Sequence, residues 1–250
     1  MSLFSAALRL QFRLLSRSPF FLSMALLTPV VYATIAGIQV GAAGAVPFRI
    51  VLGAGLLGAW STTLFGAAEA LFMQRFSGTL ELLVGAPRSL LVPVLGFSCA
   101  SVLLGLYSIG AVWLWSTVAF HVEPLTASTP VTVLSLVVSF VGLATVGVAL
   151  AGVYVLTRQA MAISNMMEYP VWIVCGVLTP ATSLWPPLLW IGKLLPLGWT
   201  VAAMDEVDPV AAVRDLAVAV AVAVGYFGLG AVVLARIDLL ARVAGTLRLR

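Results

Sequence analysis

Long apolar runs separated by short polar stretches make up most of the sequence. A helix needs roughly 20 apolar residues to cross a hydrocarbon core of about 30 Å. Runs of this kind lie at residues 20–40, 50–72, 90–120, 131–156 and 210–234. The pattern therefore predicts five membrane-spanning helices before any other property is considered.

The segment between the last two of these runs is also apolar, but prolines interrupt it. From residue 169 to residue 178 there are only ten apolar residues, which give about 15 Å of helix, half the hydrocarbon thickness. We therefore expect a full fifth span over residues 161–178, followed by an external re-entrant hairpin over residues 179–205. The alternative is that the fifth segment is itself a re-entrant half-helix shielded by protein.

The first 18 residues have a different pattern. Arg9, Arg13 and Arg17 recur at every fourth position, and a second stripe is formed by Phe4, Leu8, Phe12 and Leu15. This spacing predicts an amphipathic helix that lies along the membrane interface. The Ser18–Pro19 step is expected to end it.

Composition supports an all-α integral membrane protein with six spans and a single domain over residues 1–250. The chain is 62% hydrophobic and only 9% charged, whereas soluble domains carry about 25% charged residues. This composition excludes a sizeable soluble domain, and we expect membrane lipid to surround the protein. The net charge of +4 is spread thinly along the chain, so no nucleic-acid partner is predicted.

The distribution of basic residues predicts the orientation. If the N-terminus is cytoplasmic, only Arg49, Lys193 and Arg214 fall outside. The other basic residues then fall inside, namely Arg9, Arg13, Arg17, Arg75, Arg88, Arg158, Arg236, Arg242, Arg248 and Arg250. This asymmetry agrees with the positive-inside rule. Both termini are therefore expected on the cytoplasmic side.

The polar stretch MQRFSGTLELLVGAPRS, residues 73–89, predicts a short helix. Thr79 is placed to cap its start, and Glu81 then falls in the first turn, where the helix dipole favours an anion. Gly85 suits a left-handed C-cap, and Pro87 prevents continuation. One apolar face is formed by Leu80, Leu83 and Val84. Because two helical turns are marginal alone in water, we expect another surface to bind this helix.

This stretch carries a family resemblance. RFSGTLELLVGAPRS resembles the R-x-x-G-T-L-E-x-L-L-x-x-P pattern between the second and third spans of type 2 ABC exporter permeases. VLTPATSLWPPLLWIGKLLPLGWTVAAM resembles the proline-rich segment before their last span, although Cys175 replaces a common serine. The resemblance covers essentially the whole chain.

The resemblance implies a membrane subunit with separate partners. It would bind two ABC ATP-binding subunits and pair with a second copy or a homologous permease. Residues 74–88 would form the coupling segment, with the coupling role carried by Arg75, Gly78, Thr79, Leu80, Glu81, Leu83 and Pro87. A bacterial plasma membrane is the implied location, and the substrate would be a drug-like, lipid or other amphiphilic molecule.

The sequence lacks the residues for ATP hydrolysis. It has no G-x-x-x-x-G-K-[ST] phosphate-binding loop, and its single lysine, Lys193, is expected outside. We therefore expect no ATPase activity, metal or cofactor on this chain. ATP and Mg²⁺ would bind the partner subunit.

Two acidic residues inside predicted spans are candidates for function, because intramembrane charges are costly. Glu69 could instead reach the interface or pair with Arg75. Glu168 is predicted near the middle of the fifth span, where it would line the pathway and contact an amphiphilic cation. The other candidates for this face are Asn165, Met166 and Tyr169. A boundary shift would instead bring Glu168 within reach of Arg158.

Two other functions compete with an exporter permease. A self-sufficient secondary carrier or channel would need an ion relay, for which Glu69 and Glu168 are the candidates. A membrane scaffold or maturation factor would bind an ATPase without transporting anything.

Overall fold

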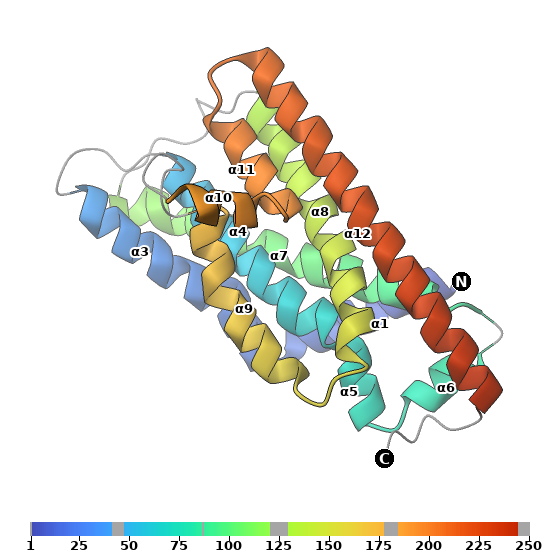
Figure 1. Cartoon of the computed structure of the whole chain (residues 1–250). Coiled ribbons are helices and arrows are strands. Elements are labelled where there is room, and N and C mark those ends of the chain that lie inside the picture. Colours follow the sequence, from blue (N-terminus) through green and yellow to red (C-terminus); the bar gives the residue numbers. More distant parts are fainter. Residues whose placement is uncertain (1, 42–47, 87, 121–129, 178–184, 245–250) are drawn as a thin grey trace.

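The computed structural model describes residues 2–41, 48–86, 88–120, 130–177 and 185–244, and every regular element within these ranges is a helix. Figure 1 shows the helices packed into one bundle. Four helical stretches are long and apolar enough to cross a membrane: Val51–Phe76, Leu91–Phe120, Pro130–Tyr154 and Pro209–Ala241. Two bent helix pairs raise the number of candidate spans to as many as six. The predicted all-helical membrane class is confirmed.

The N-terminal helix and its sharp end are present. α1 (Leu3–Arg17) is followed by α2 (Pro19–Leu22), η1 (Ser23–Leu27) and α3 (Thr28–Gly41). The axis turns by 80° between Leu3–Arg17 and Pro19–Ile35. Proline at the first position of α2 suits a helix start, because its missing N–H has no partner there in any helix.

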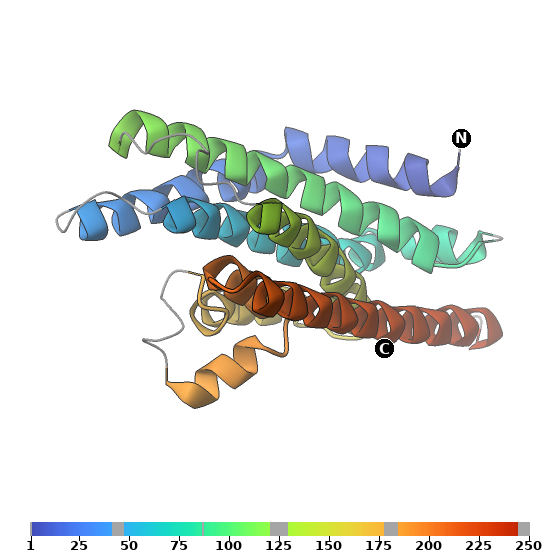
Figure 2. The same cartoon turned by 90° about the horizontal axis from the view of Figure 1, so that it is seen from above.

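α1 lies along α7 (Leu91–Phe120), as Figure 2 shows. Its three arginines are exposed, as predicted, but the side that packs against the bundle consists of Ala7, Gln11 and Leu15. Of the predicted apolar stripe, Phe4 is exposed and only Leu15 is buried. Small and polar residues replace the expected apolar ones because α1 contacts a close-packed helix, in which Gly96 lies against it.

The second span is the centre of the bundle. It consists of α4 (Phe48–Thr62), a π-helical segment η2 (Thr63–Ala68) and α5 (Ala70–Phe76). Its apolar stretch is entirely buried inside the chain. A π-helical turn shifts the backbone hydrogen bonds by one residue and so changes which carbonyls need partners. The side-chain amide of Gln11 donates to the Gly66 carbonyl at 2.9 Å, which ties α1 to this segment.

The remaining long helices agree with the prediction to different degrees. α8 (Pro130–Tyr154) matches the fourth predicted span closely. α9 (Ala160–Val174) has 15 residues, about 22 Å of helix, and is shorter than the fifth span predicted over residues 161–178, so a full crossing by this segment stays a prediction. It ends in a turn at Gly176, whose φ of 68° is left-handed. α12 (Pro209–Ala244) has 36 residues and extends well past residue 234, where the last span was predicted to end.

Two short helices precede α12. α10 (Pro186–Gly192) and α11 (Pro196–Asp205) each begin at a proline, and their axes are bent by 115°. This arrangement has the shape of the hairpin predicted for residues 179–205, although residues 178–184 lie outside the described ranges. Its re-entry into the membrane stays a prediction.

Candidate functional site

The predicted short helix exists at one end of the bundle (Figure 1). α6 (Leu80–Gly85) follows α5 after a turn in which Gly78 has a φ of 71°. Glu81 lies in its first turn, as predicted. The predicted cap is wrong, because the Thr79 hydroxyl makes no capping bond. It donates to the Gln74 backbone carbonyl at 3.2 Å and also bonds the Gln74 side-chain oxygen.

The left-handed glycine precedes α6 instead of following it. Gly85 is the last helical residue and has no positive φ, and the chain leaves the helix through an extended Ala86. The C-cap predicted for Gly85 is therefore wrong. Pro87 lies outside the described residues.

The chain itself covers the apolar face of α6. Leu80 and Val84 are buried and Leu83 is partly buried, in a cluster that also holds residues of α5, α7 and α12. These neighbours include Leu71, Leu90, Leu234 and Ile237. Leu80 is only 3% exposed, so it holds α6 against the bundle and is not available to a partner protein.

Two large apolar residues near α6 point away from the chain. Phe76 is 85% exposed and Leu82 is 76% exposed, and Glu81 is exposed beside Leu82. Neither residue was predicted from the sequence, because neither belongs to the regular apolar stripe of α6. The available signal was an apolar side chain off that stripe within an otherwise polar segment.

A cavity of about 390 Å³ lies beside this surface. The cavity lies between α5 and the connection from α8 to α9. Its lining residues are Phe72, Arg75, Phe76, Thr157 and Arg158. Arg75 donates from Nη1 to the Val155 carbonyl at 2.8 Å. The alternative pairing of Arg75 with Glu69 is therefore wrong, and Arg75 instead fixes α5 to the end of α8.

Glu168 is buried and bonded to the central span. It is 4% exposed, and the Ser61 hydroxyl donates to its carboxylate at 2.7 Å. Glu168 bonds Ser61 and not Arg158, because Arg158 lies before the start of α9 at Ala160, and eight positions of helix, about 12 Å, separate that start from Glu168. Trp172 lies one turn further along α9. The centre of its ring is 4.6 Å from that of Tyr32 and 5.0 Å from that of Tyr169.

The residues predicted to share a face with Glu168 lie elsewhere. Asn165, Met166 and Tyr169 are all exposed, and Met166 is 78% exposed. Asn165 uses its side-chain amide to bond the Met161 carbonyl at 2.9 Å. These three residues form an outer face of α9, whereas Glu168 points inward, so the predicted group is split.

Glu69 is a second, separate buried carboxylate. It is 2% exposed at the junction of η2 and α5, and its Oε1 has no hydrogen-bond partner. Ser164 of α9 and Tyr154 of α8 lie beside it. Within the described ranges, no group of His, Cys, Asp or Glu could hold a metal ion. Glu69 in the second span and Glu168 in α9 thus both face the protein interior, because both are buried.

Together these features define a multi-pass helical membrane protein with a small helix fixed at one end of its bundle. A family model described as "ABC-2 type transporter" matches residues 2–207. The chain belongs to this family, and it is a transmembrane component of an ABC transporter, not the ATPase. No curated protein and no solved structure gives a significant match.

Proposed function

We propose that the chain is the transmembrane subunit of an ATP-driven exporter and that α6 couples it to a separate ATP-binding subunit. One observation carries this proposal. The apolar face of α6 is fixed to the bundle, while Glu81, Leu82 and Phe76 remain exposed at the same end. A folded surface with large unburied apolar side chains is typical of a protein interface.

The packing of α6 supports a mechanical role. Leu80 and Val84 contact the cluster that contains Leu234 and Ile237 of α12 and Leu90 next to α7. Closure of two ATP-binding subunits around ATP and Mg²⁺ would displace α6. Because cores are close-packed, that displacement would reach α7 and α12 directly.

The pathway would lie between two copies of the chain, or between this chain and a homologous permease. The exposed face of α9, with Asn165, Met166 and Tyr169, is available to line it. Apolar and polar groups on one face suit a drug-like, lipid or other amphiphilic substrate. Both termini would face the cytoplasm of a bacterial cell, on the side of the ATP-binding subunits.

The test of coupling uses co-purification with a co-expressed ABC ATP-binding subunit that the wild-type chain retains. Leu82→Arg and Glu81→Arg should each reduce the bound ATP-binding subunit by about tenfold, because each places a new charge in the interface. Val207→Arg is the matched control. Val207 is 95% exposed between α11 and α12, at the opposite end of α12 from α6. Normal binding by both α6 variants, or equal loss with Val207→Arg, would contradict the proposal.

A secondary carrier is distinguished by its energy source. Under our proposal, proteoliposomes need the ATP-binding subunit and ATP for transport. Gradient-driven transport by the purified chain alone, abolished by Glu168→Gln, would instead identify a carrier. Unchanged selectivity of the ATP-driven complex with Glu168→Gln would remove Glu168 from the substrate pathway.

A further inference from the structure

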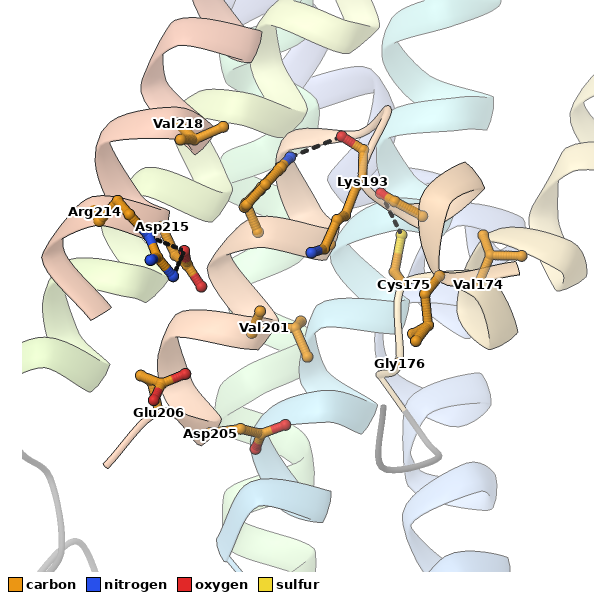
Figure 3. A pocket seen from close by; sticks show the side chains of 15 residues that line it. Val174, Cys175, Gly176, Lys193, Val201, Asp205, Glu206, Arg214, Asp215 and Val218 are labelled. Atoms are coloured by element: carbon orange, nitrogen blue, oxygen red, sulfur yellow. Dashed lines mark hydrogen bonds and ion pairs between the residues drawn. The ribbon is translucent and has the colours of Figure 1, made fainter. Parts of the chain in front are cut away.

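A second cavity lies at the other end of the bundle, away from α6. Its volume is about 500 Å³, within the range of sites that bind small molecules. The end of α9, both short helices and the first turns of α12 surround it. Figure 3 shows charged side chains on opposite sides of this cavity.

Lys193 supplies the positive side. Its ammonium lies 4.7 Å from the centre of the Trp199 ring and 5.4 Å from that of Trp190. The Trp199 indole N–H also donates to the Lys193 carbonyl at 2.7 Å, which fixes the pair. The face of an aromatic ring attracts a cation electrostatically, without an oxygen or nitrogen acceptor. A lysine ammonium has three N–H donors. The ammonium therefore keeps donors for an anionic group.

Carboxylates supply the negative side. Asp215 is buried, with 9% of its side chain exposed, and its Oδ1 accepts two bonds of 3.2 Å from Arg214. Asp205 and Glu206 also line the cavity. These acids do not gather into a metal-binding group among the described residues. Because Asp215 is paired with Arg214, Asp205 and Glu206 are the carboxylates that, together with Lys193, complement a ligand carrying both charges.

The surroundings of the cavity point to a lipid. The hairpin exposes large apolar side chains next to the cavity, namely Trp185, Trp190, Ile191 and Leu194. Tryptophan is enriched at membrane–water interfaces. In α12, Asp215 lines the cavity and Leu234 packs beside α6. The helix between these two residues spans about 28 Å, close to the hydrocarbon thickness of a bilayer. About one hydrocarbon thickness along α12 therefore separates the cavity from α6.

We propose that this cavity binds the head group of an amine-bearing phospholipid from the outer leaflet. Its phosphate lies at Lys193, and its ammonium lies towards Asp205 and Glu206. The acyl chains cover the exposed apolar residues of the hairpin, including Trp190 and Leu194. This site is independent of coupling to an ATPase, because it needs only residues of this chain.

The test is native mass spectrometry of the purified full chain with equimolar phosphatidylethanolamine and phosphatidylglycerol of matched acyl chains. We expect about fivefold more retained phosphatidylethanolamine. Lys193→Met should lower that retention by about tenfold, because a charge-assisted bond to the phosphate is lost. Glu206→Gln should lower it by about threefold. Arg236→Met, which removes an exposed charge near the other end of α12, should leave it unchanged.

Two results would overturn this assignment. The first is equal retention of both lipids, or unchanged retention in both cavity variants. Glu206 is exposed, so Glu206→Gln keeps the test valid even if loss of Lys193 disturbs its two tryptophans. The second is displacement of lipid by millimolar free phosphoethanolamine, which would identify a soluble zwitterion as the ligand. Neither result bears on ATPase coupling, since no ATP-binding subunit is present.

Discussion

At the scale of single residues, Ser61 holds the carboxylate of Glu168 inside the bundle. Removing one partner of a buried hydrogen bond leaves the other partner unsatisfied, which costs about 1–3 kcal/mol. Ser61→Ala should therefore lower the thermal unfolding temperature of the purified protein clearly. Ser135→Ala is the control, because the Ser135 hydroxyl is buried without any partner. Equal melting temperatures for the two variants would show that the Ser61 bond contributes nothing.

Gly78 offers a second test at this scale. Its φ of 71° is left-handed, which costs other residues about 1–2 kcal/mol. No atom lies within 4 Å of an added Cβ, so Gly78→Ala acts through the backbone alone. Hydrogen exchange of the α6 amides should become faster in this variant. Gly85→Ala is matched, since Gly85 is also open but helical, and it should slow exchange or leave it unchanged.

At the scale of elements, the packing of α10 against α9 depends on the absence of a side chain. A Cβ on Gly192 would lie 1.9 Å from the Val174 carbonyl oxygen, and one on Gly198 would lie 2.3 Å from that of Gly192. Backbone atoms cannot move aside as a flexible side chain can. The hairpin therefore has to shift as a unit if either glycine is replaced.

Gly192→Ala should accordingly lower the yield of monodisperse protein and its melting temperature. It should also reduce phospholipid retention, because α9 and α10 line the cavity. Gly228→Ala is the matched control in α12, where an added Cβ meets nothing within 4 Å. That change should be neutral or stabilise the helix by about 0.5–1 kcal/mol. A Gly192→Ala protein as stable as the parent would show that the hairpin is not fixed at this contact.

At the scale of the whole molecule, the predicted orientation can be measured directly. Phe76 and Val207 are among the most exposed apolar residues. Phe76 ends α5 and Val207 lies between α11 and α12, and these elements are at opposite ends of the bundle (Figure 1). In a background with Cys99 and Cys175 replaced, a membrane-impermeant maleimide should label Val207→Cys from outside intact cells. Phe76→Cys should react only after permeabilisation. The reverse pattern would place α6 outside and exclude any contact with a cytoplasmic ATPase.

Much of this architecture could be predicted because it follows from local pattern. The bend at Ser18–Pro19, α7, α8 and the existence of α6 each depend on nearby residues. Errors arose where a distant partner decides the outcome. Glu168 meets Ser61, which lies 107 positions away. No periodicity within α9 reveals that contact. The error at Thr79 is an exception, because Thr79 bonds Gln74, only five positions back, in place of the helix terminus.

The sequence by itself determined that this chain is a helical membrane protein with a short helix in the polar connection between its second and third spans. Apolar run length and charge asymmetry are local quantities, and the membrane turns them directly into spans. Only the tertiary structure decided which side of α6 is free, which carboxylates are buried, and that Lys193 faces acids across a cavity. Those outcomes depend on close packing between segments far apart in the chain, which no local pattern encodes.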